Sequence, residues 1–429
     1  MNDSKNNTAW EKIFLKHELL KRISDYGFAE ISSKEINNFR EARLMTKFDH
    51  KSQLPQIFSH NNLSILPISR GGYTIGNFKT FHQFDSDESI NVPITFPTFL
   101  ESLDYKNITS ESTAINCAFV SNILKDFTSE ISLFPTVSGR MSSSSFDFLI
   151  DTAKGNHKII VENSQIEIDG GFEGDYSLNL IEAKNYISDD FLIRQLFYPY
   201  KLWSNKISKK VRPIFLSYTN GIFHLREYEF QDNNLYNSIK LVNYKKYIIE
   251  DTGFNTEVLN EIIDRTIILK EPNDTPFPQA NSFERVINLC ELLNQKGFIS
   301  KEEITQNYDF DSRQTDYYSN AAKYLGLVEI KRDVATGLIG CFLTKKGKSI
   351  FNLSLTERQK EFVKMIVSQS VFNKTLKRAL ENGEIPKKEE IVEIMKSSNL
   401  NKVDSPKTFI RRSSTIIGWI NWIFSQIDE

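Results

Sequence analysis

Residues 159–200 read IIVENSQIEIDGGFEGDYSLNLIEAKNYISDDFLIRQLFYPY, and the rest of the chain is organised around them. Two runs in which apolar residues alternate, 164–168 and 178–183, predict a pair of neighbouring strands. We interpret the segment between the runs as a connecting loop because it is rich in glycine. These glycines are Gly170, Gly171 and Gly174.

Charged residues stand at the ends of both predicted strands. They are Glu167 and Asp169 on the first strand, and Glu182 and Lys184 on the second. Ionised carboxylates near a sheet core are costly unless they have a partner, so several that converge at one strand end need a cation. Oxygen ligands without nearby Cys and with little His suit Mg2+, or Mn2+ in its place, better than zinc.

Composition indicates the class of protein in which these motifs occur. The chain has 429 residues, of which 40% are hydrophobic and 25% charged, and this length indicates several domains. Its net charge of -2 does not by itself indicate nucleic-acid binding. It does not exclude such binding either, because acidic residues elsewhere can offset a basic face. Three cysteines without CxxC spacing favour neither a disulfide framework nor a zinc site. No apolar run approaches a membrane span or a signal peptide, so we expect a cytoplasmic protein.

The first part of the chain predicts two helices and a hairpin. Periodicity favours helices over 9–26 and 33–40, the second capped by Ser32 or Ser33 with Glu35 in its first turn. The glycine pair at 71–72 is typical of a hairpin turn and not of a phosphate loop, because no P-loop lysine follows it. Two interpretations stay open for the basic residues of this part: DNA phosphate contacts, or a solvated surface, which we favour. These residues are Arg43, Lys47 and Arg70.

The region around the central stretch predicts a mixed sheet with a helix on its face. Helices are expected over 112–127 and 189–203, and a strand over 146–150 that carries Asp147, a structural residue or a further metal ligand. Beyond the second helix, two apolar strands flank Asn220-Gly221, the strongest short hairpin signal in the chain.

The stretch IEIDGGFEGDYSLNLIEAK resembles the signature of the PD-(D/E)XK nucleases. Asp169 matches the first acid, and Glu182-Ala183-Lys184 match the (D/E)XK element. RQLFYPY is similar to the Gln/Tyr helix of parts of that superfamily, and the segments around 43–76 and 138–148 are similar to a group of bacterial type II restriction endonucleases. The chain departs from the plain pattern because no Pro precedes Asp169. The resemblance implies an α/β (α+β) restriction-endonuclease-like core.

The resemblance also implies a role for each residue. Asp169 and Glu182, with the Ala183 carbonyl, would hold Mg2+, which lowers the pKa of a bound water and screens phosphate charge. Lys184 would orient that water and stabilise the developing oxyanion. Glu167 would support a second metal or accept a proton, and Gln195 would hydrogen-bond the water or a phosphate. Tyr198 is either part of this site or core. The alternative for the motif is an exposed Glu-Lys pair, worth about 0 to 1 kcal/mol.

After a proline-rich linker at 271–280, the pattern changes to short helices. Helices are expected over 282–294, 301–307 and 311–324, the second with a capping box from Ser300 to Glu303, followed by two strands around a polar turn. Three helices and a two-stranded wing are typical of a winged helix-turn-helix, whose third helix enters the major groove. As exposed base-reading candidates we take Arg313, Gln314, Tyr317, Tyr318 and Lys323, and as backbone contacts Lys331, Arg332, Lys345 and Lys346.

The last segment, 354–429, is predicted to be helical, with an apolar stripe along its final helix. We interpret it as a second helix-turn-helix that presents Thr408, Arg411, Arg412 and Ser414 to DNA, with its tryptophans in a core or a dimer contact. The expected domains are therefore an endonuclease region at 1–270, the linker, a winged unit at 281–353 and this helical unit.

Together these patterns predict a type II restriction endonuclease that hydrolyses double-stranded DNA with Mg2+. Cutting both strands needs two active sites, so we expect a homodimer, and a DNA methyltransferase as functional partner. The alternatives are a nuclease for modified or branched DNA, and a non-catalytic winged-helix DNA-binding regulator.

Overall fold

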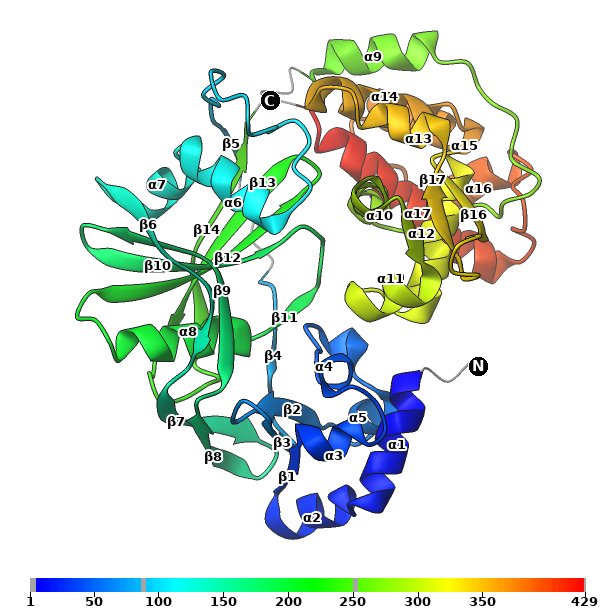
Figure 1. Cartoon of the computed structure of the whole chain (residues 1–429). Coiled ribbons are helices and arrows are strands. Elements are labelled where there is room, and N and C mark those ends of the chain that lie inside the picture. Colours follow the sequence, from blue (N-terminus) through cyan, green and yellow to red (C-terminus); the bar gives the residue numbers. More distant parts are fainter. Residues whose placement is uncertain (1–4, 86–89, 250–253, 428–429) are drawn as a thin grey trace.

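The computed structural model describes residues 5–85, 90–249 and 254–427. Within them the protein is a mixed α/β structure with 17 α-helices and a seven-stranded mixed sheet. Figure 1 shows an N-terminal unit (blue), the large sheet with its helices (cyan and green), and a mainly helical C-terminal unit (yellow to red).

The N-terminal unit packs small helices on a three-stranded sheet of order β1-β3-β2. Its elements are α1 (Lys5–Lys16), α2 (Leu19–Tyr26), β1 (Phe28–Ser32), α3 (Ser33–Asn37), α4 (Ala42–Met45), η1 (Lys51–Gln53), α5 (Gln56–His60), β2 (Ser64–Pro67) and β3 (Gly72–Gly76). The prediction of one helix over 9–26 is wrong: Glu18 adopts a left-handed φ of 49° and separates α1 from α2. The predicted hairpin is confirmed by β2 and β3, and Ser32 caps α3 in a capping box with Glu35.

The large sheet has the order β5-β14-β13-β12-β10-β9-β6. Its strands are β5 (Asn91–Pro93), β6 (Leu133–Ser142), β9 (Gln165–Gly174), β10 (Ser177–Lys184), β12 (Lys210–Thr219), β13 (Ile222–Phe230) and β14 (Ile239–Ile248). β10 runs antiparallel to β9 and parallel to β12. Asn220 and Gly221, both with positive φ, form the predicted turn between β12 and β13.

Helices cover both faces of this sheet. α6 (Glu111–Val120) and α7 (Ile123–Thr128) pack on one face, where Ile115 shares a core with Ile181, and α8 (Arg194–Ser204) packs on the other, where Leu196 shares a core with Leu180. The predicted helix over 189–203 begins instead with a short strand, β11 (Asp190–Leu192), which pairs with β4 (Phe81–Gln83).

Two expectations about the central region are wrong. The three glycines of the supposed loop lie inside β9, and a side chain at Gly171 would contact Val137 of β6, so the glycine permits close approach of the edge strand. The strand over 146–150 belongs to a separate hairpin of β7 (Ser145–Thr152) and β8 (Gly155–Glu162), while the Ser/Gly-rich segment before it forms β6.

The C-terminal unit begins after α9 (Thr256–Arg265). It contains α10 (Phe283–Lys296), β15 (Phe298–Ser300), α11 (Lys301–Asn307), α12 (Ser312–Tyr324), β16 (Val328–Arg332), β17 (Ile339–Leu343), α13 (Lys345–Ile350), α14 (Leu355–Val367), α15 (Ser370–Asn382), α16 (Lys388–Lys396) and α17 (Pro406–Phe424). Ser300 caps α11 as predicted, but the Glu303 carboxylate binds Lys296 instead of closing a capping box.

One hydrophobic core runs through this unit. It joins Phe283 and Ile299 from the first half of the unit to Phe362 and Trp419 from the second half. Trp419 also donates from its indole to the Ala280 carbonyl at 2.7 Å, which places the tryptophan in the core, one of the two predicted settings.

Gly418 generates a stability prediction whose sign depends on packing. A Cβ at this position would clash with the Asn281 carbonyl. On the same helix, Thr415 Oγ1 donates to Asn281 Oδ1 at 3.2 Å. Gly to Ala inside a helix ordinarily stabilises by about 0.5–1 kcal/mol, whereas overpacking costs about 1–3 kcal/mol. We therefore expect Gly418→Ala to lower the free energy of unfolding in urea denaturation. Ser414→Ala on the same helix is the control; stabilisation by Gly418→Ala would contradict the packing argument.

Candidate active site

The centre of the site is the C-terminal end of β10. All eight residues of this strand are buried, as expected for a central strand covered on both faces. Alternation puts Glu182 and Lys184 on the same face as Leu178 and Leu180, the face that α8 covers. The strand therefore carries two charged side chains where its apolar pattern calls for two more core residues.

Asp169 lies beside these residues on β9. Ile181 pairs with Gly170 across the two strands, so the next residues, Glu182 and Asp169, are neighbours. The Ala183 amide donates to Asp169 Oδ2 at 2.9 Å, which holds this carboxylate against the end of β10. The structure thus brings together the first acid and the Glu-Ala-Lys element that the sequence singled out.

Glu182 and Lys184 are both hydrogen-bonded within the site. Glu182 Oε1 accepts from Lys184 Nζ at 2.5 Å and from Gln195 Nε2 at 2.6 Å, and the Ala183 carbonyl accepts from Lys184 Nζ at 3.2 Å. Gln195 comes from the first turn of α8. Its Oε1 is buried and has no hydrogen-bond partner within the described part of the chain, so an acceptor is available beside the carboxylates.

Two further acids, which the sequence analysis missed, face the same lysine. Glu111, in the first turn of α6, lies 3.9 Å from Lys184 Nζ, and Asp49 of the N-terminal unit interacts electrostatically with Lys184 and Glu182. Glu111 follows the N-cap Ser110, a common place for an acid, and Asp49 follows the mixed segment Thr46-Lys47-Phe48, so neither position carries a local signal of a site.

Burial and neighbouring charges shift the pKa values of these groups: those of Glu182, Glu111 and Lys184 are raised, and that of Asp49 is lowered because Lys184 and other cations outweigh its burial. Burial, with Asp169 nearby, raises the pKa of Glu182 to about 8, although Lys184 opposes the shift. The pKa of Glu111 is also raised, by burial and by Asp169. Burial alone would lower the pKa of Lys184, but Glu182, Tyr186 and the other acids around it raise it well above its usual value. Acidic groups therefore outnumber the lysine at the end of β10, an arrangement that could hold an additional cation.

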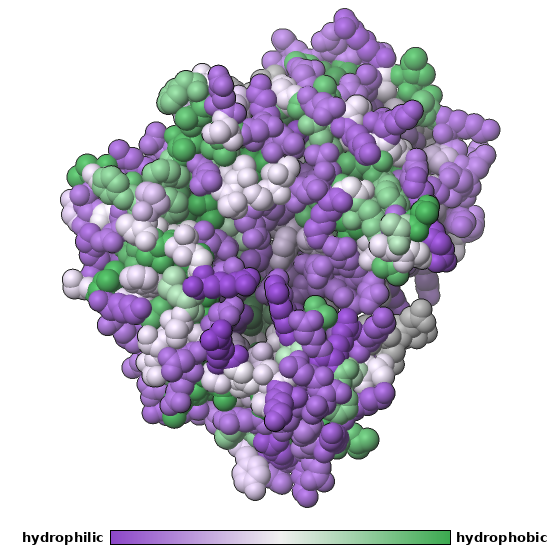
Figure 2. Space-filling model, viewed as in Figure 1, coloured by the Kyte–Doolittle hydropathy of each residue, from purple (hydrophilic) through white to green (hydrophobic). Residues whose placement is uncertain are grey.

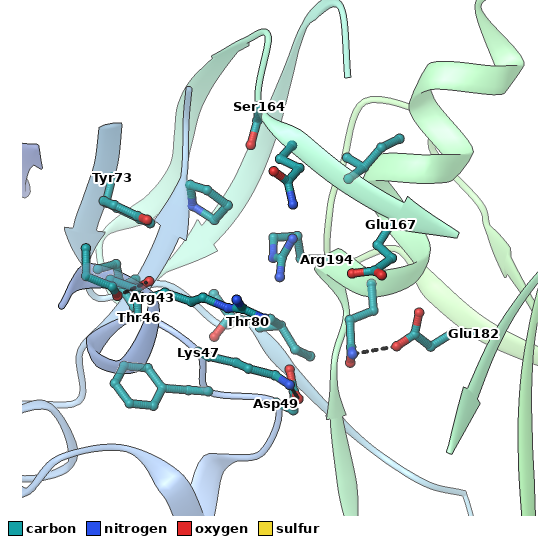
Figure 3. A pocket seen from close by; sticks show the side chains of 18 of the residues that line it. Arg43, Thr46, Lys47, Asp49, Tyr73, Thr80, Ser164, Glu167, Glu182 and Arg194 are labelled. Atoms are coloured by element: carbon teal, nitrogen blue, oxygen red, sulfur yellow. Dashed lines mark hydrogen bonds and ion pairs between the residues drawn. The ribbon is translucent and has the colours of Figure 1, made fainter. Parts of the chain in front are cut away.

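The site opens into a cleft of about 1010 Å³. Figure 2 shows a hollow in the middle of the molecule, bordered largely by hydrophilic residues. Residues of the N-terminal unit form one wall, the ends of β9 and β10 with α8 form the other, and Lys296, Asn307 and Tyr308 of the C-terminal unit also line it. In Figure 3, Arg43 and Lys47 extend from the first wall towards the space in front of Glu182.

The other predicted residues of the nuclease region lie elsewhere or have other partners. Glu167 lines the cleft but is half exposed and pairs with Arg140 at 3.3 Å. Asp147 pairs with Lys158 on the β7–β8 hairpin and does not line the cleft. Tyr198 is fully buried and donates to the Pro67 carbonyl, so it belongs to the core.

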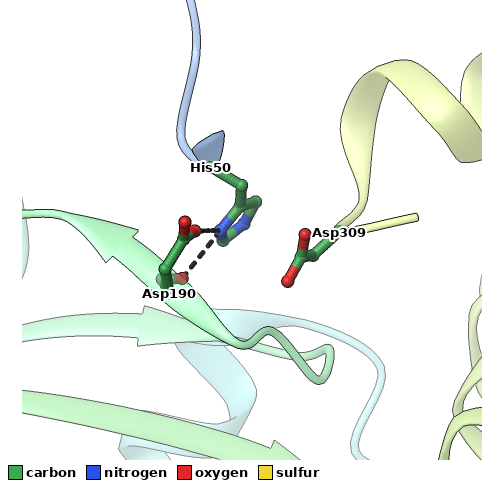
Figure 4. Close-up of side chains that lie close together, drawn as sticks. All are labelled: His50, Asp190 and Asp309. Atoms are coloured by element: carbon green, nitrogen blue, oxygen red, sulfur yellow. Dashed lines mark hydrogen bonds and ion pairs between the residues drawn. The ribbon is translucent and has the colours of Figure 1, made fainter. Parts of the chain in front are cut away.

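A second acidic cluster, also missed from the sequence, joins the three units. His50, Asp190 and Asp309 place ligand atoms within 4.8 Å of one another, a geometry that could hold a metal ion (Figure 4). Each group already has protein partners: His50 Nδ1 contacts the Asp190 carbonyl at 2.8 Å, and Asp309 accepts from Ser52 at 2.6 Å. We interpret the cluster as a structural link, since its bonds connect segments far apart in sequence.

The predicted base-reading residues on α12 are exposed only in part. Arg313 is exposed, and Tyr317 is half buried. Gln314 accepts from the Asp311 amide in a capping box, and Lys323 pairs with Asp274 at 2.9 Å. The prediction that Tyr318 is exposed is wrong: it is 8% exposed and packs edge-on against Phe310.

The remaining predicted DNA contacts have different settings. In the strands after α12, Lys331 pairs with Glu329 at 2.7 Å and Arg332 donates to the Gly337 carbonyl, both at the surface. On α17, Thr408 lies in the first turn and Arg411 is exposed. Arg412 instead donates to the Phe277 carbonyl, and burial lowers its pKa to about 10, so its guanidinium is engaged within the protein.

Comparison with known protein families gives three matches. Residues 7–75, 76–248 and 285–428 match the models of three domains of unknown function, DUF6996, DUF6997 and DUF7226 respectively. The second match includes β9, β10 and α8, whereas Asp49 falls within the first. No curated protein and no solved structure gives a significant match. Within the described residues, no helix has the length and apolar character needed to cross a membrane.

The raised pKa of Glu182 generates a prediction about cation binding. Because this pKa is about 8 instead of 4.5, the folded protein keeps the proton over a pH range in which the unfolded chain loses it. The stability from this proton is present below about pH 4.5 and is lost as the pH rises through about 8. A divalent cation must displace the same proton, so its affinity should increase over this range.

We therefore expect Mg2+ to raise the melting temperature more at pH 8 than at pH 6, measured by calorimetry. Glu182→Gln should remove this pH dependence. Equal shifts at both pH values in the unaltered protein would show that no cation competes with this proton.

Proposed function

We propose that the protein is a Mg2+-dependent endonuclease of the PD-(D/E)XK type, which hydrolyses double-stranded DNA at specific sequences as a type II restriction enzyme does. The observation that carries the proposal is the convergence of Asp169, Glu182 and Lys184 at the floor of a polar cleft. The order of elements around them supports it: helices α6 and α7, strands β6, β9 and β10, helix α8, and the parallel strand β12.

The residues present fit a divalent cation. Asp169 and Glu182 offer carboxylate oxygens, acids outnumber the lysine, and the buried Gln195 Oε1 lacks a partner among the described residues. Mg2+ bound there would lower the pKa of a water and screen the phosphate charge. The Ala183 carbonyl would join as a ligand if Lys184 Nζ, which now binds it, turned towards the substrate.

The protein's own groups supply the remaining chemistry. Lys184 would orient the attacking water and stabilise the negative charge that develops on the phosphate oxygen. Gln195 donates to Glu182 through its amide nitrogen, and its Oε1 can accept a hydrogen bond from the water. Glu167 would accept a proton or support a second cation from the rim of the cleft.

The C-terminal unit supports DNA recognition. Its order of helix, strand, two helices and two strands, with the sheet order β15-β17-β16, fits a winged helix-turn-helix. The ends of α10 and α11 line the cleft through Lys296 and Asn307, so a duplex read by this unit would lie next to the active site. We further propose a cytoplasmic homodimer, paired in function with a DNA methyltransferase.

Two alternatives are tested by the same reaction. A nuclease for modified or branched DNA would cut only such substrates. A winged-helix regulator would bind DNA without a metal and cut nothing. The burial of Glu182 and Lys184 argues against the regulator, because burying these groups carries a desolvation cost that a protein without a catalytic site has no reason to bear.

Removal of the catalytic groups gives the direct test. Purified protein is incubated with sequence-diverse duplex DNA in Mg2+ or EDTA, and the product ends are sequenced. We expect discrete ends at one motif in Mg2+ alone. Lys184→Ala and Asp169→Ala should abolish cleavage and keep DNA binding, because they remove charge stabilisation and a cation ligand. Lys210→Ala, a surface lysine on β12, is the matched control, and cutting by Lys184→Ala would disprove its assigned role.

Arg313 gives a second prediction, on recognition. It is exposed near the start of α12, where a side chain can reach a base edge. Arg313→Ala should cost about 1–3 kcal/mol of discrimination between the recognition motif and its one-base variants, measured by competition binding. Lys377→Ala on α15 serves as control. A uniform loss across all sequences would make Arg313 a phosphate contact.

A further inference from the structure

The N-terminal unit forms a wall of the cleft that the nuclease signature does not include. Its hydrophobic core, built around Trp10 and Phe58, is separate from the cores of the large sheet. It nevertheless faces β10, because Asp49 interacts with Lys184 and Glu182. Because this unit has its own core, its folding alone does not account for its position over the proposed catalytic residues.

Basic side chains of this unit line the cleft. Arg43 on α4, Lys47 just after it and Arg70 in the β2–β3 turn are all exposed. Within the described residues, neither the Arg43 nor the Arg70 guanidinium has an ion-pair partner, and Lys47 has only Asp49, at 3.6 Å. These three cations lie opposite the carboxylates of β9 and β10, so positive charge borders a largely acidic floor.

The opposite wall adds two more guanidinium groups. Arg194, in the first turn of α8, points into the same space as Arg43 and Lys47 (Figure 3). Arg140 of β6 lines the cleft beside Glu167. A chain of phosphates passing through the cleft would therefore meet cations on both sides of the acidic floor.

This wall is held in place by specific bonds. Tyr198 of α8 donates to the Pro67 carbonyl at 2.9 Å, His50 contacts Tyr186 at 2.9 Å, and the Glu162 amide donates to the Ile68 carbonyl at 2.8 Å. Because Arg43, Lys47 and Arg70 stand on an anchored unit, their positions relative to Lys184 are set before any ligand binds.

We infer that the N-terminal unit is a DNA-backbone clamp, in which Arg43, Lys47 and Arg70 bind phosphates flanking the one that lies at Asp169, Glu182 and Lys184. This inference rests on the proposed function and assigns to residues 7–75 the binding of a nucleic-acid phosphodiester backbone. These contacts would carry no base information, since they go to phosphates and not to base edges. The solvated-surface interpretation favoured from the sequence does not explain why the three cations share one cleft with the acids.

Arg43→Ala/Arg70→Ala tests the clamp, with Lys12→Ala/Lys21→Ala as matched control on exposed positions of α1 and α2 outside the cleft. Fluorescence anisotropy measures binding of a sequence-diverse duplex pool over a range of salt concentrations, with Ca2+ in place of Mg2+. We expect the double variant to bind at least about tenfold more weakly and the slope of log K against log salt to fall by about 2, one unit for each lost phosphate contact. The control should keep both values.

The outcomes separate this inference from the proposed function. Unaltered protein that cuts DNA, with a double variant of unchanged salt slope, would overturn the clamp alone. Unaltered protein that neither binds nor cuts any duplex would overturn the proposed function and the clamp with it. Circular dichroism tests whether the double variant is folded; because Arg43 and Arg70 have no ion-pair partner among the described residues, we expect no loss of structure.

Discussion

The rest of the site depends on the buried contact between Glu182 and Lys184, because burying these two groups costs free energy that other bonds must offset. A carboxyl group and an ammonium group at the end of a strand covered on both faces lose their hydration, and the bond between them offsets this cost only if their remaining bonding positions are satisfied. Gln195 supplies one bond, and Asp169 is fixed alongside by the Ala183 amide. Glu111 and Asp49 lie near Lys184 as two further acids. A purely structural pair of Glu182 and Lys184 would not require them. This excess is the physical basis for expecting a bound cation.

The site also depends on how three units are joined. The N-terminal unit, which carries Asp49, is docked in part through His50, which contacts Asp190 and Tyr186. From the other side, Arg285 of the C-terminal unit donates to the Asp309 carbonyl at 2.7 Å and to Asp189 at 2.8 Å. These polar links join the units around the cleft, so a change in the packing of either unit would reach the proposed catalytic residues. Binding, recognition and chemistry would then be coupled through the same few hydrogen bonds.

On this interpretation, the three segments that match domains of unknown function have different roles. The segment that matches the second model carries the signature residues, and the segment that matches the third contains the proposed winged helix. The segment that matches the first supplies Asp49 and the cations of the clamp. An isolated Glu-Lys pair at a surface would be worth about 0 to 1 kcal/mol and would require none of these partners. The pair observed here is buried and lines a cleft to which all three units contribute.

The sequence by itself determined the features that depend on local pattern. Alternating apolar residues predicted β9 and β10 with their acids, Asn220-Gly221 predicted its turn, and Ser300 predicted the start of α11, because strand periodicity, turn dihedral angles and helix caps are properties of a few neighbouring residues. Only the tertiary structure decided the rest. Gly171 lies in a strand because Val137 approaches it, Tyr318 is buried against Phe310, and Glu111 and Asp49 face Lys184 from distant segments. Such contacts join residues far apart in the chain, so no local pattern of one sequence contains them.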